Sequence, residues 1–217
     1  GRVMDVTSVG AKVYTASESQ GVFEVNPALP YDQAFISQYD SPGLAYALQV
    51  QGLAAFLADS NQGLRFLDLS VSPPASAGQF NTSNARDVAL DGAFAYVADS
   101  ANGLQIVDLG AIPPADGGTV ALPNGGNAEG IAVFNGFAYL AAAEGGLMVV
   151  DLVVPGFPTY HFDAPGINAR DVDVGFNPFT QKTYAYLADD LNGLRIVDVS
   201  DPAAMTQVRL LAPGPGH

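Results

Sequence analysis

The sequence of 217 residues contains no cysteine and no tryptophan. The absence of cysteine excludes disulfides, thiol nucleophiles and cysteine-ligated zinc, but it leaves the cellular compartment open. Only two histidines are present, His161 and His217, and no glycine-rich loop opens a helical pattern. The sequence therefore supports neither a Ser-His-Asp triad nor a nucleotide-binding loop, and we predict no enzymatic activity.

Positive charge is scarce as well. Eight Lys and Arg residues stand against 22 Asp and Glu residues, which gives a formal net charge of −14, and the only lysines are Lys12 and Lys182. A surface of this sign repels phosphate groups, so nucleic acid is excluded as a partner. No apolar run is long enough to cross a bilayer, so no direct membrane insertion is predicted.

A leader segment is also lacking. No basic-then-apolar stretch precedes the first predicted strand at Val3, and the sequence ends in Ala212-Pro-Gly-Pro-Gly-His. Both features favour a processed or excised piece of a longer protein. Residues 212–217 are predicted to form a Pro/Gly tail.

What the sequence does contain is a repeat. The pattern GLRIVDV begins at Gly193, with close copies at Gly146, Gly103 and Gly63 and a weaker copy, GVFEVNP, at Gly21. These glycines are 40 to 47 residues apart, and a period of this length indicates a repeat architecture. We predict one domain over residues 1–211, divided into repeats at about 1–43, 44–83, 84–126, 127–167 and 168–211.

Each repeat contains four short runs rich in β-branched and aromatic residues. In the third repeat, the turns between the first three runs contain Asp91-Gly92 and Asn102-Gly103, which are the strongest short hairpin signals. The middle runs are apolar on both faces, so both faces of each small sheet must be covered. The sequence thus predicts an all-β fold, a closed five-bladed β-propeller of four-stranded antiparallel blades, with part of a larger propeller as the alternative.

The fifth repeat carries a family resemblance. Its motif GLRIVDVSDP, preceded by ARDV and AYLAD, strongly resembles the LVIVD-repeat family of propeller proteins, and the likeness extends over essentially the whole chain. The resemblance implies a β-propeller that is usually secreted or attached to the bacterial or archaeal cell surface. It implies no established catalytic activity.

Two sets of acidic residues recur in register. Four of them close the motif strand and are predicted to hold the following turn by accepting its backbone N–H groups, namely Asp68, Asp108, Asp151 and Asp198. Three others begin the first strand of repeats one, three and five, namely Asp5, Asp87 and Asp171. We predict that the second set lies at the mouth of a central channel.

Oxygen ligands at such a mouth suit calcium or a small polar ligand, glycans included. The alternative is a structural role. The carboxylates could accept hydrogen bonds from neighbouring backbone N–H groups, or Asp87 and Asp171 could pair with Arg86 and Arg170, their neighbours in the sequence. A third interpretation is glycoside hydrolysis, which needs two carboxylates about 5 to 9.5 Å apart. Calcium is the only cofactor that these residues suggest.

An interaction surface is the remaining candidate site. The first hairpin of the fifth repeat is six residues longer than its counterparts, and a long loop follows the first motif strand. These two excursions carry Phe176, Phe179 and Lys182, and Tyr31, Phe35 and Tyr39. The alternative for the hairpin of the fifth repeat is that it is a packed loop whose aromatic residues point inward.

We therefore predict a non-enzymatic extracellular or cell-surface module for interaction or assembly, which binds protein partners or itself. A calcium- or carbohydrate-binding module and a glycoside hydrolase are the alternatives.

Overall fold

The structure is a computed structural model that describes residues 1–123 and 125–213, and these form β-strands with two 3₁₀ helices, η1 (Asp190–Asn192) and η2 (Pro202–Ala204). No α-helix occurs among these residues, and neither short helix is long and apolar enough to cross a membrane. The predicted tail at 212–217 lies outside the described residues from position 214 onward.

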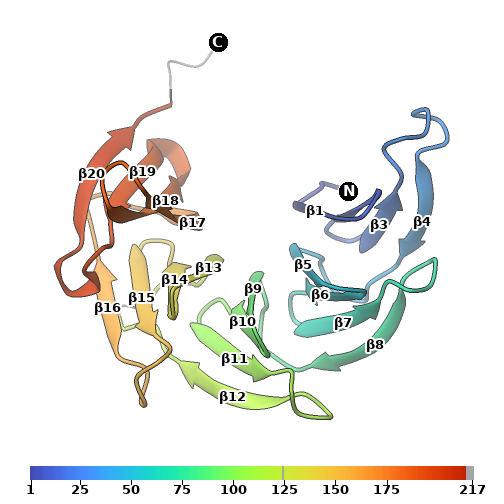
Figure 1. Cartoon of the computed structure of the whole chain (residues 1–217), viewed down its shortest axis with the longest axis horizontal. Helices are drawn as coiled ribbons and strands as arrows, with labels where there is room; N and C mark the ends of the chain where they lie inside the picture. The colour runs from blue at the N-terminus through green and yellow to red at the C-terminus, as the bar shows by residue number, and fades with distance from the viewer. Residues whose placement is uncertain (124, 214–217) are drawn as a thin grey trace. The chain divides into compact units, whose positions relative to one another are not determined.

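The strands form five sheets of four strands each, and each sheet is a meander in which consecutive strands pair (Figure 1). We number them as blades. Blade 1 is β1 (Asp5–Val9), β2 (Lys12–Ala16), β3 (Val22–Val25) and β4 (Phe35–Tyr39). Blade 2 is β5 (Ala47–Gln51), β6 (Ala54–Ala58), β7 (Leu64–Asp68) and β8 (Ala75–Phe80). Blade 3 is β9 (Asp87–Asp91), β10 (Phe94–Ala98), β11 (Leu104–Asp108) and β12 (Ala115–Val120).

Blade 4 is β13 (Gly130–Phe134), β14 (Phe137–Ala141), β15 (Leu147–Asp151) and β16 (Thr159–Phe162). Blade 5 is β17 (Ala169–Asn177), β18 (Lys182–Asp189), β19 (Gly193–Asp198) and β20 (Thr206–Leu211). The predicted four-stranded antiparallel blade is thus present in all five repeats, and the predicted all-β propeller fold is confirmed.

The chain divides into two compact units. The first contains residues 1–97 and 106–117, and the second contains residues 98–105 and 118–217. Blades 1 and 2 belong to the first unit and blades 4 and 5 to the second, while the strands of blade 3 contribute to both.

Neighbouring blades bury their apolar faces against each other. In the first unit, Tyr14 of blade 1 packs in one cluster with Leu57 of blade 2, and Phe56 of blade 2 packs in another with Val97 of blade 3. In the second unit, blade 4 packs on blade 5 in the same way. Because blade 2 is covered on both faces, its middle strand β6 is apolar throughout, and the apolar run of β7 is interrupted only by Arg65 before the strand ends at Asp68.

Two structural features require glycine at the first position of the motif. Gly63 has a φ of +78°, and a Cβ there would lie 2.3 Å from the carbonyl oxygen of Phe80. Gly193 has a φ of +92°, and its Cβ would lie 2.2 Å from the carbonyl oxygen of Leu211. A side chain would therefore be strained at this position and would also collide with the fourth strand, which explains why the glycine marks every repeat.

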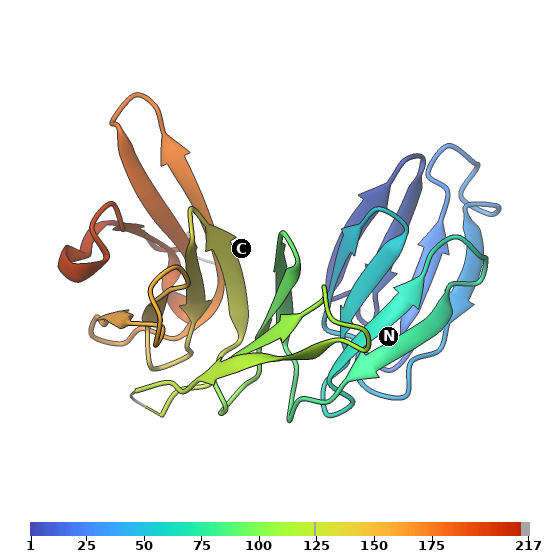
Figure 2. The same ribbon diagram turned by 60° about the horizontal axis from the view of Figure 1, so that its bottom comes forward.

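Blade 5 differs from the others in its first hairpin. Strands β17 and β18 have nine and eight residues, whereas their counterparts β13 and β14 have five each. Figure 2 shows this orange hairpin as the long projection of blade 5. Most of the additional residues of the repeat therefore extend the strand ladder, and the others lengthen the turn to residues 178–181.

Candidate functional site

Each blade has two ends of different chemistry. Because the strands alternate in direction, the turn between the first and second strands and the loop between the third and fourth lie at one end. We call this the apolar end. The turn between the second and third strands lies at the opposite end together with the connections to neighbouring blades, and we call this the polar end.

The apolar end carries exposed large side chains at the same place in successive repeats. They lie in the loop between the third and fourth strands, as Leu29 and Tyr31, Val71, Ile112, and Val153 and Val154. Tyr31 and Ile112 are each 98% exposed. Of these residues only Tyr31 was predicted from the sequence. The sequence does carry a signal for the others, since each of these loops has an apolar residue that is adjacent to a proline or two residues from one.

The hairpin of blade 5 adds two aromatic rings to the apolar end. Phe176 is 49% exposed and Phe179, in the turn, is 95% exposed, so neither packs inward. Lys182 lies beside them, but its ammonium is 2.5 Å from the Asp198 carboxylate. The charge of Lys182 is therefore balanced within the blade, and the two phenylalanines remain as the exposed apolar groups of this hairpin.

The second predicted patch requires a correction. Phe35 and Tyr39 lie in strand β4 and not in the preceding loop. Tyr39 is half-buried and packs against the core between blades 1 and 2, so it is not available to a partner. Phe35 is exposed and meets Phe23 edge to face at 5.9 Å between ring centroids. The strand was not evident in the sequence because a short strand with mostly exposed residues resembles a loop in its pattern.

The four motif acids lie where the third strand enters the apolar loop. In each case the carboxylate accepts the N–H of the residue two positions later, over 2.8 Å in Asp68 and Asp108, 2.9 Å in Asp151 and 3.1 Å in Asp198. The hydrogen bonds from the Ser70 hydroxyl and N–H hold the pKa of Asp68 below its usual range. These acids therefore stabilise the start of the loop and place a negative charge beside its apolar tip.

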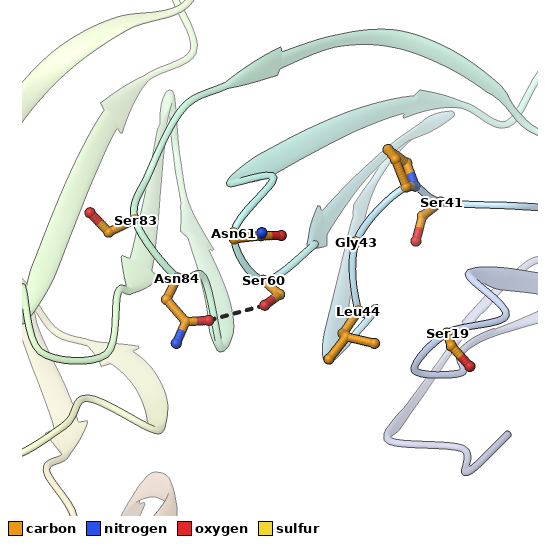
Figure 3. Close-up of a pocket in the computed structure, with 9 residues that line it drawn as sticks. Ser19, Ser41, Gly43, Leu44, Ser60, Asn61, Ser83 and Asn84 are labelled. Atoms are coloured by element: carbon orange, nitrogen blue, oxygen red, sulfur yellow. Dashed lines mark hydrogen bonds between the residues drawn. The ribbon is translucent and has the colours of Figure 1, made fainter.

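The polar end of the first unit contains an open cavity of about 630 Å³. Its lining comes from four loops of blades 1 to 3 and consists of Ser19, Ser41, Pro42, Gly43, Leu44, Ser60, Asn61, Ser83 and Asn84. The Ser60 hydroxyl and the Asn84 side-chain oxygen are 3.1 Å apart (Figure 3). None of the nine residues is charged, so the cavity suits a neutral polar ligand and lacks the carboxylate pair of a glycosidase.

The carboxylates of the first-strand acids accept hydrogen bonds from backbone N–H groups. Asp5 accepts the N–H of Leu48 in the next blade at 2.7 Å with one oxygen and its neighbour's N–H at 2.7 Å with the other. Asp87 and Asp171 each accept the N–H of the following residue, at 2.7 and 2.8 Å. Within residues 1–123 and 125–213 no group of three or more His, Asp or Glu side chains is placed to hold a metal ion. This arrangement favours the structural alternative over calcium ligation.

Two buried ion pairs were not predicted from the sequence. Asp189 and Arg195 of blade 5 are 0% and 3% exposed, and the guanidinium Nη2 is 2.5 Å from the carboxylate. Asp59 and Arg65 form the corresponding pair in blade 2, 3.0 Å apart. Burial alone would raise the pKa of Asp189, but the Asn168 N–H, Arg195 and Asn192 more than offset it, so the pKa is lowered. The signal was an Arg in the second position after the motif glycine.

Blade 1 contains a buried charge at a different position of the repeat. Glu24 is 0% exposed and occupies the place that Phe66 has in blade 2. Its carboxylate lies 2.5 Å from the Lys12 ammonium and accepts the hydroxyls of Ser37 and Ser72 at 2.5 and 2.7 Å. Burial would raise the pKa of Glu24, yet these three partners together lower it. Because Ser72 belongs to blade 2, this cluster links the two blades.

The fold and these sites define a repeat scaffold, a β-propeller with structural acids and exposed apolar tips. Comparison with protein families identifies the LVIVD repeat at residues 83–111, 125–161 and 181–210. The chain therefore carries LVIVD repeats in this part of the sequence, and the resemblance is confirmed for the third, fourth and fifth repeats. No curated protein matches the chain.

Solved structures share the fold at low identity. One similar chain belongs to a crystal structure of a mitotic checkpoint complex, with a TM-score of 0.77, 12% identity and coverage of 98% of this chain and 65% of that one. Another is the computationally designed Ika8 protein, with a TM-score of 0.64, 9% identity and coverage of 92% and 59%. The chain thus spans less than two thirds of both. Since 533 solved chains match, the fold does not by itself select a function.

Proposed function

We propose that this chain is a non-catalytic, extracellular or cell-surface interaction module that binds a protein partner through the apolar ends of its blades. The observation that carries the proposal is the repetition of exposed apolar tips in the third-to-fourth strand loops. A soluble surface rarely exposes large apolar side chains at one structural position in repeat after repeat without a contact to make. A few such anchors usually supply most of the binding free energy.

The charge of the same end indicates the chemistry of the partner. Each apolar loop of blades 2 to 4 begins beside a motif carboxylate, and the chain has a net charge of −14. A partner that presents apolar side chains flanked by Lys and Arg would match both features. Electrostatic attraction would then accelerate the encounter and weaken with added salt.

Placement outside the cell rests on the LVIVD resemblance, whose family is usually secreted or surface-attached. Fractionation of the source cells tests this part, since recovery of the chain only from the cytosol would contradict it.

The contact surface is tested with immobilised peptides that alternate Leu or Trp with Arg, and with a matched set that has Glu in place of Arg. We expect the chain to bind the first set, and the combined variant Tyr31→Ser, Ile112→Ser and Phe179→Ser to bind it at least about tenfold more weakly. Leu44→Ser is the matched control, because Leu44 is 39% exposed at the polar end.

Equal binding by the combined variant and the parent chain would refute the assignment of the apolar ends. Hydrolysis of a glycan by the purified chain would refute the non-catalytic part.

A second candidate function is supported by the cavity at the polar end. Its serine and asparagine lining offers neutral donors and acceptors, so a neutral oligosaccharide is the class of ligand that it would accept. Calorimetric titration with neutral oligosaccharides tests this candidate, and heats that are unchanged by Asn61→Asp would refute it.

A further inference from the structure

The connection between blades 2 and 3 differs from the other connections between consecutive blades at two positions. In each connection the first residue after the outer strand passes close to the motif glycine. A Cβ on Gly63 would lie 3.1 Å from the Cα of Asn81, and a Cβ on Gly21 would lie 3.2 Å from the Cα of Asp40. This shared contact aligns the connections residue by residue. The aligned segments are DSP at 40–42, NTS at 81–83, ALP at 121–123 and DAP at 163–165.

The two differences fall on the positions that define an acceptor for N-linked glycans. Three of the four connections have proline at the third position, where this one has Ser83, and none of those three has asparagine at the first. Asn-x-Ser or Asn-x-Thr, with any residue except proline in the middle, is the acceptor segment. Asn81-Thr82-Ser83 is the only such segment among the 217 residues. The connection thus departs from the repeat at both positions that the acceptor requires.

The local structure leaves this segment accessible. Asn81 and Ser83 are exposed, and residues 81–84 have no helical or strand structure. The side-chain oxygen of Asn81 accepts a hydrogen bond of 2.8 Å from Gln79, but within residues 1–123 and 125–213 its Nδ2 donates none. The segment and its contacts with Gly63 and Gln79 all belong to the first unit. The fold therefore does not use the nitrogen atom to which a glycan is attached.

We infer that Asn81 is a site of N-linked glycosylation, an inference that rests on the proposed placement of the chain outside the cell. The donor is an oligosaccharide linked through diphosphate to a polyprenyl lipid, and the catalyst is a transferase of the exporting cell. The Asn81 Nδ2 forms a bond to the anomeric carbon of the first sugar, while the bond between that carbon and the diphosphate oxygen breaks. The lipid diphosphate leaves with the electron pair, and one amide proton passes to a base of the transferase. Ser83 supplies the hydroxyl that the acceptor segment requires.

A glycan at this position would leave the proposed contact surface uncovered. In blade 2 the apolar tip with Val71 precedes β8, and Asn81 follows β8. The six residues of this strand separate the two sites by about 20 Å. The glycan would add bulk and hydration at the polar end, next to Ser83 and Asn84 of the cavity, and the apolar end would stay available to a partner.

Peptide mass spectrometry of the chain purified from its source cells tests the inference. Trypsin cleaves the denatured chain after Arg65 and Arg86, so residues 66–86 form one peptide, and the only asparagines in it are Asn81 and Asn84. We expect this peptide to carry the added mass of one or more sugar residues. Electron-transfer fragmentation should place that mass on Asn81 and leave Asn84 unmodified.

Four variants made in the same cells separate the acceptor segment from its surroundings. Asn81→Gln and Ser83→Ala should each lose the added mass, because one lacks the acceptor nitrogen and the other lacks the hydroxyl. Ser83→Thr should keep it, since threonine restores the hydroxyl. Asn61→Gln is the matched control and should also keep it, because Asn61 is an exposed asparagine of the same end that is not in an acceptor segment.

The outcomes distinguish this inference from the proposed location of the chain. An unmodified peptide from chain recovered outside the cell would overturn the inference and leave the location intact, whereas recovery of the chain only from the cytosol would overturn both. Added mass that stays on the peptide in Asn81→Gln, or that is absent in Ser83→Thr, would also overturn the inference.

Discussion

Replacement of Arg195 by Met should be among the most destabilising single changes at a charged residue of this chain. The change removes the guanidinium that lies 2.5 and 2.9 Å from the Asp189 carboxylate and leaves that carboxylate buried with 0% exposure. Loss of one partner from a buried pair costs about 3 to 5 kcal/mol, because the remaining charge is neither solvated nor compensated. Donors from Asn168 and Asn192 remain, which favours the lower half of that range.

Blade 4 supplies the control for this prediction. Ala142 and Met148 occupy the places of Asp189 and Arg195, and both are buried. The repeat therefore tolerates an apolar pair at these two positions. The double variant Asp189→Ala with Arg195→Met should recover most of the stability that Arg195→Met loses, because no buried charge is left unpaired.

Urea unfolding at neutral pH measures the difference in the free energy of unfolding. For a chain of this size the melting temperature should fall by roughly 2 to 4 °C per kcal/mol, so a drop of roughly 6 to 16 °C is expected for Arg195→Met. A single variant as stable as the parent, or a double variant no better than the single one, would refute the reasoning.

The pH dependence has a defined sign. The folded pKa of Asp189 is lowered, so its contribution to stability is fully present above the ordinary aspartate pKa of about 3.9 and is lost as the pH falls through the folded value. In Arg195→Met, burial without the guanidinium instead favours protonation. The difference in stability between the parent and this variant should therefore begin to narrow as the pH falls toward about 4, where the variant gains stability, and should narrow further below it, where the parent loses stability.

Two further changes test the blade design. Glu24→Gln should lower the free energy of unfolding by about 1 to 3 kcal/mol above pH 5. The loss should be smaller at pH 3, because the lowered pKa of Glu24 means that its contribution to stability, like that of Asp189, decreases as the pH falls. An unchanged urea midpoint at neutral pH would contradict this prediction. Gly63→Ala should lower the free energy of unfolding by at least about 1 to 3 kcal/mol, because φ is +78° and the new Cβ would lie 2.3 Å from a carbonyl oxygen. Gly52→Ala should lower it less, because φ is also positive there, at +64°, but nothing lies within 4 Å of the new Cβ. Equal losses in the two variants would show that the backbone conformation alone determines the effect.

The fold was predictable because it depends on local signals that repeat. Gly63 and Gly193 mark the start of the third strand for steric reasons, and turn pairs such as Asp91-Gly92 fix the hairpins. Apolar runs on both faces required stacked sheets. The alternation of strand and turn therefore carried most of the architecture.

The contacts between repeats were not predictable in the same way. Glu24 looked like a degenerate motif position, but it is paired with Lys12 and with Ser72 of the next blade. Arg195, in the second position after the motif glycine, indicates a buried ion pair only when it is considered together with Asp189, six residues earlier. The exposed loops containing Val71 and Ile112 were missed because exposure follows from packing and not from residue type.

The first-strand acids show how blade packing can resemble a ligand site in sequence. They occur in blades 1, 3 and 5, while blades 2 and 4 have Ala47 and Gly130 at the same place. A Cβ on Gly130 would lie 2.7 Å from both the Cα and a carboxylate oxygen of Asp171, so the small residue of the even blade makes room for the acid of the next.

Asp5 in turn fastens its blade to the backbone of Leu48. These contacts between blades support the structural alternative for the alternation of acidic and small residues. The ends of the blades are positions that this packing does not occupy, so they can vary without loss of the contacts between blades.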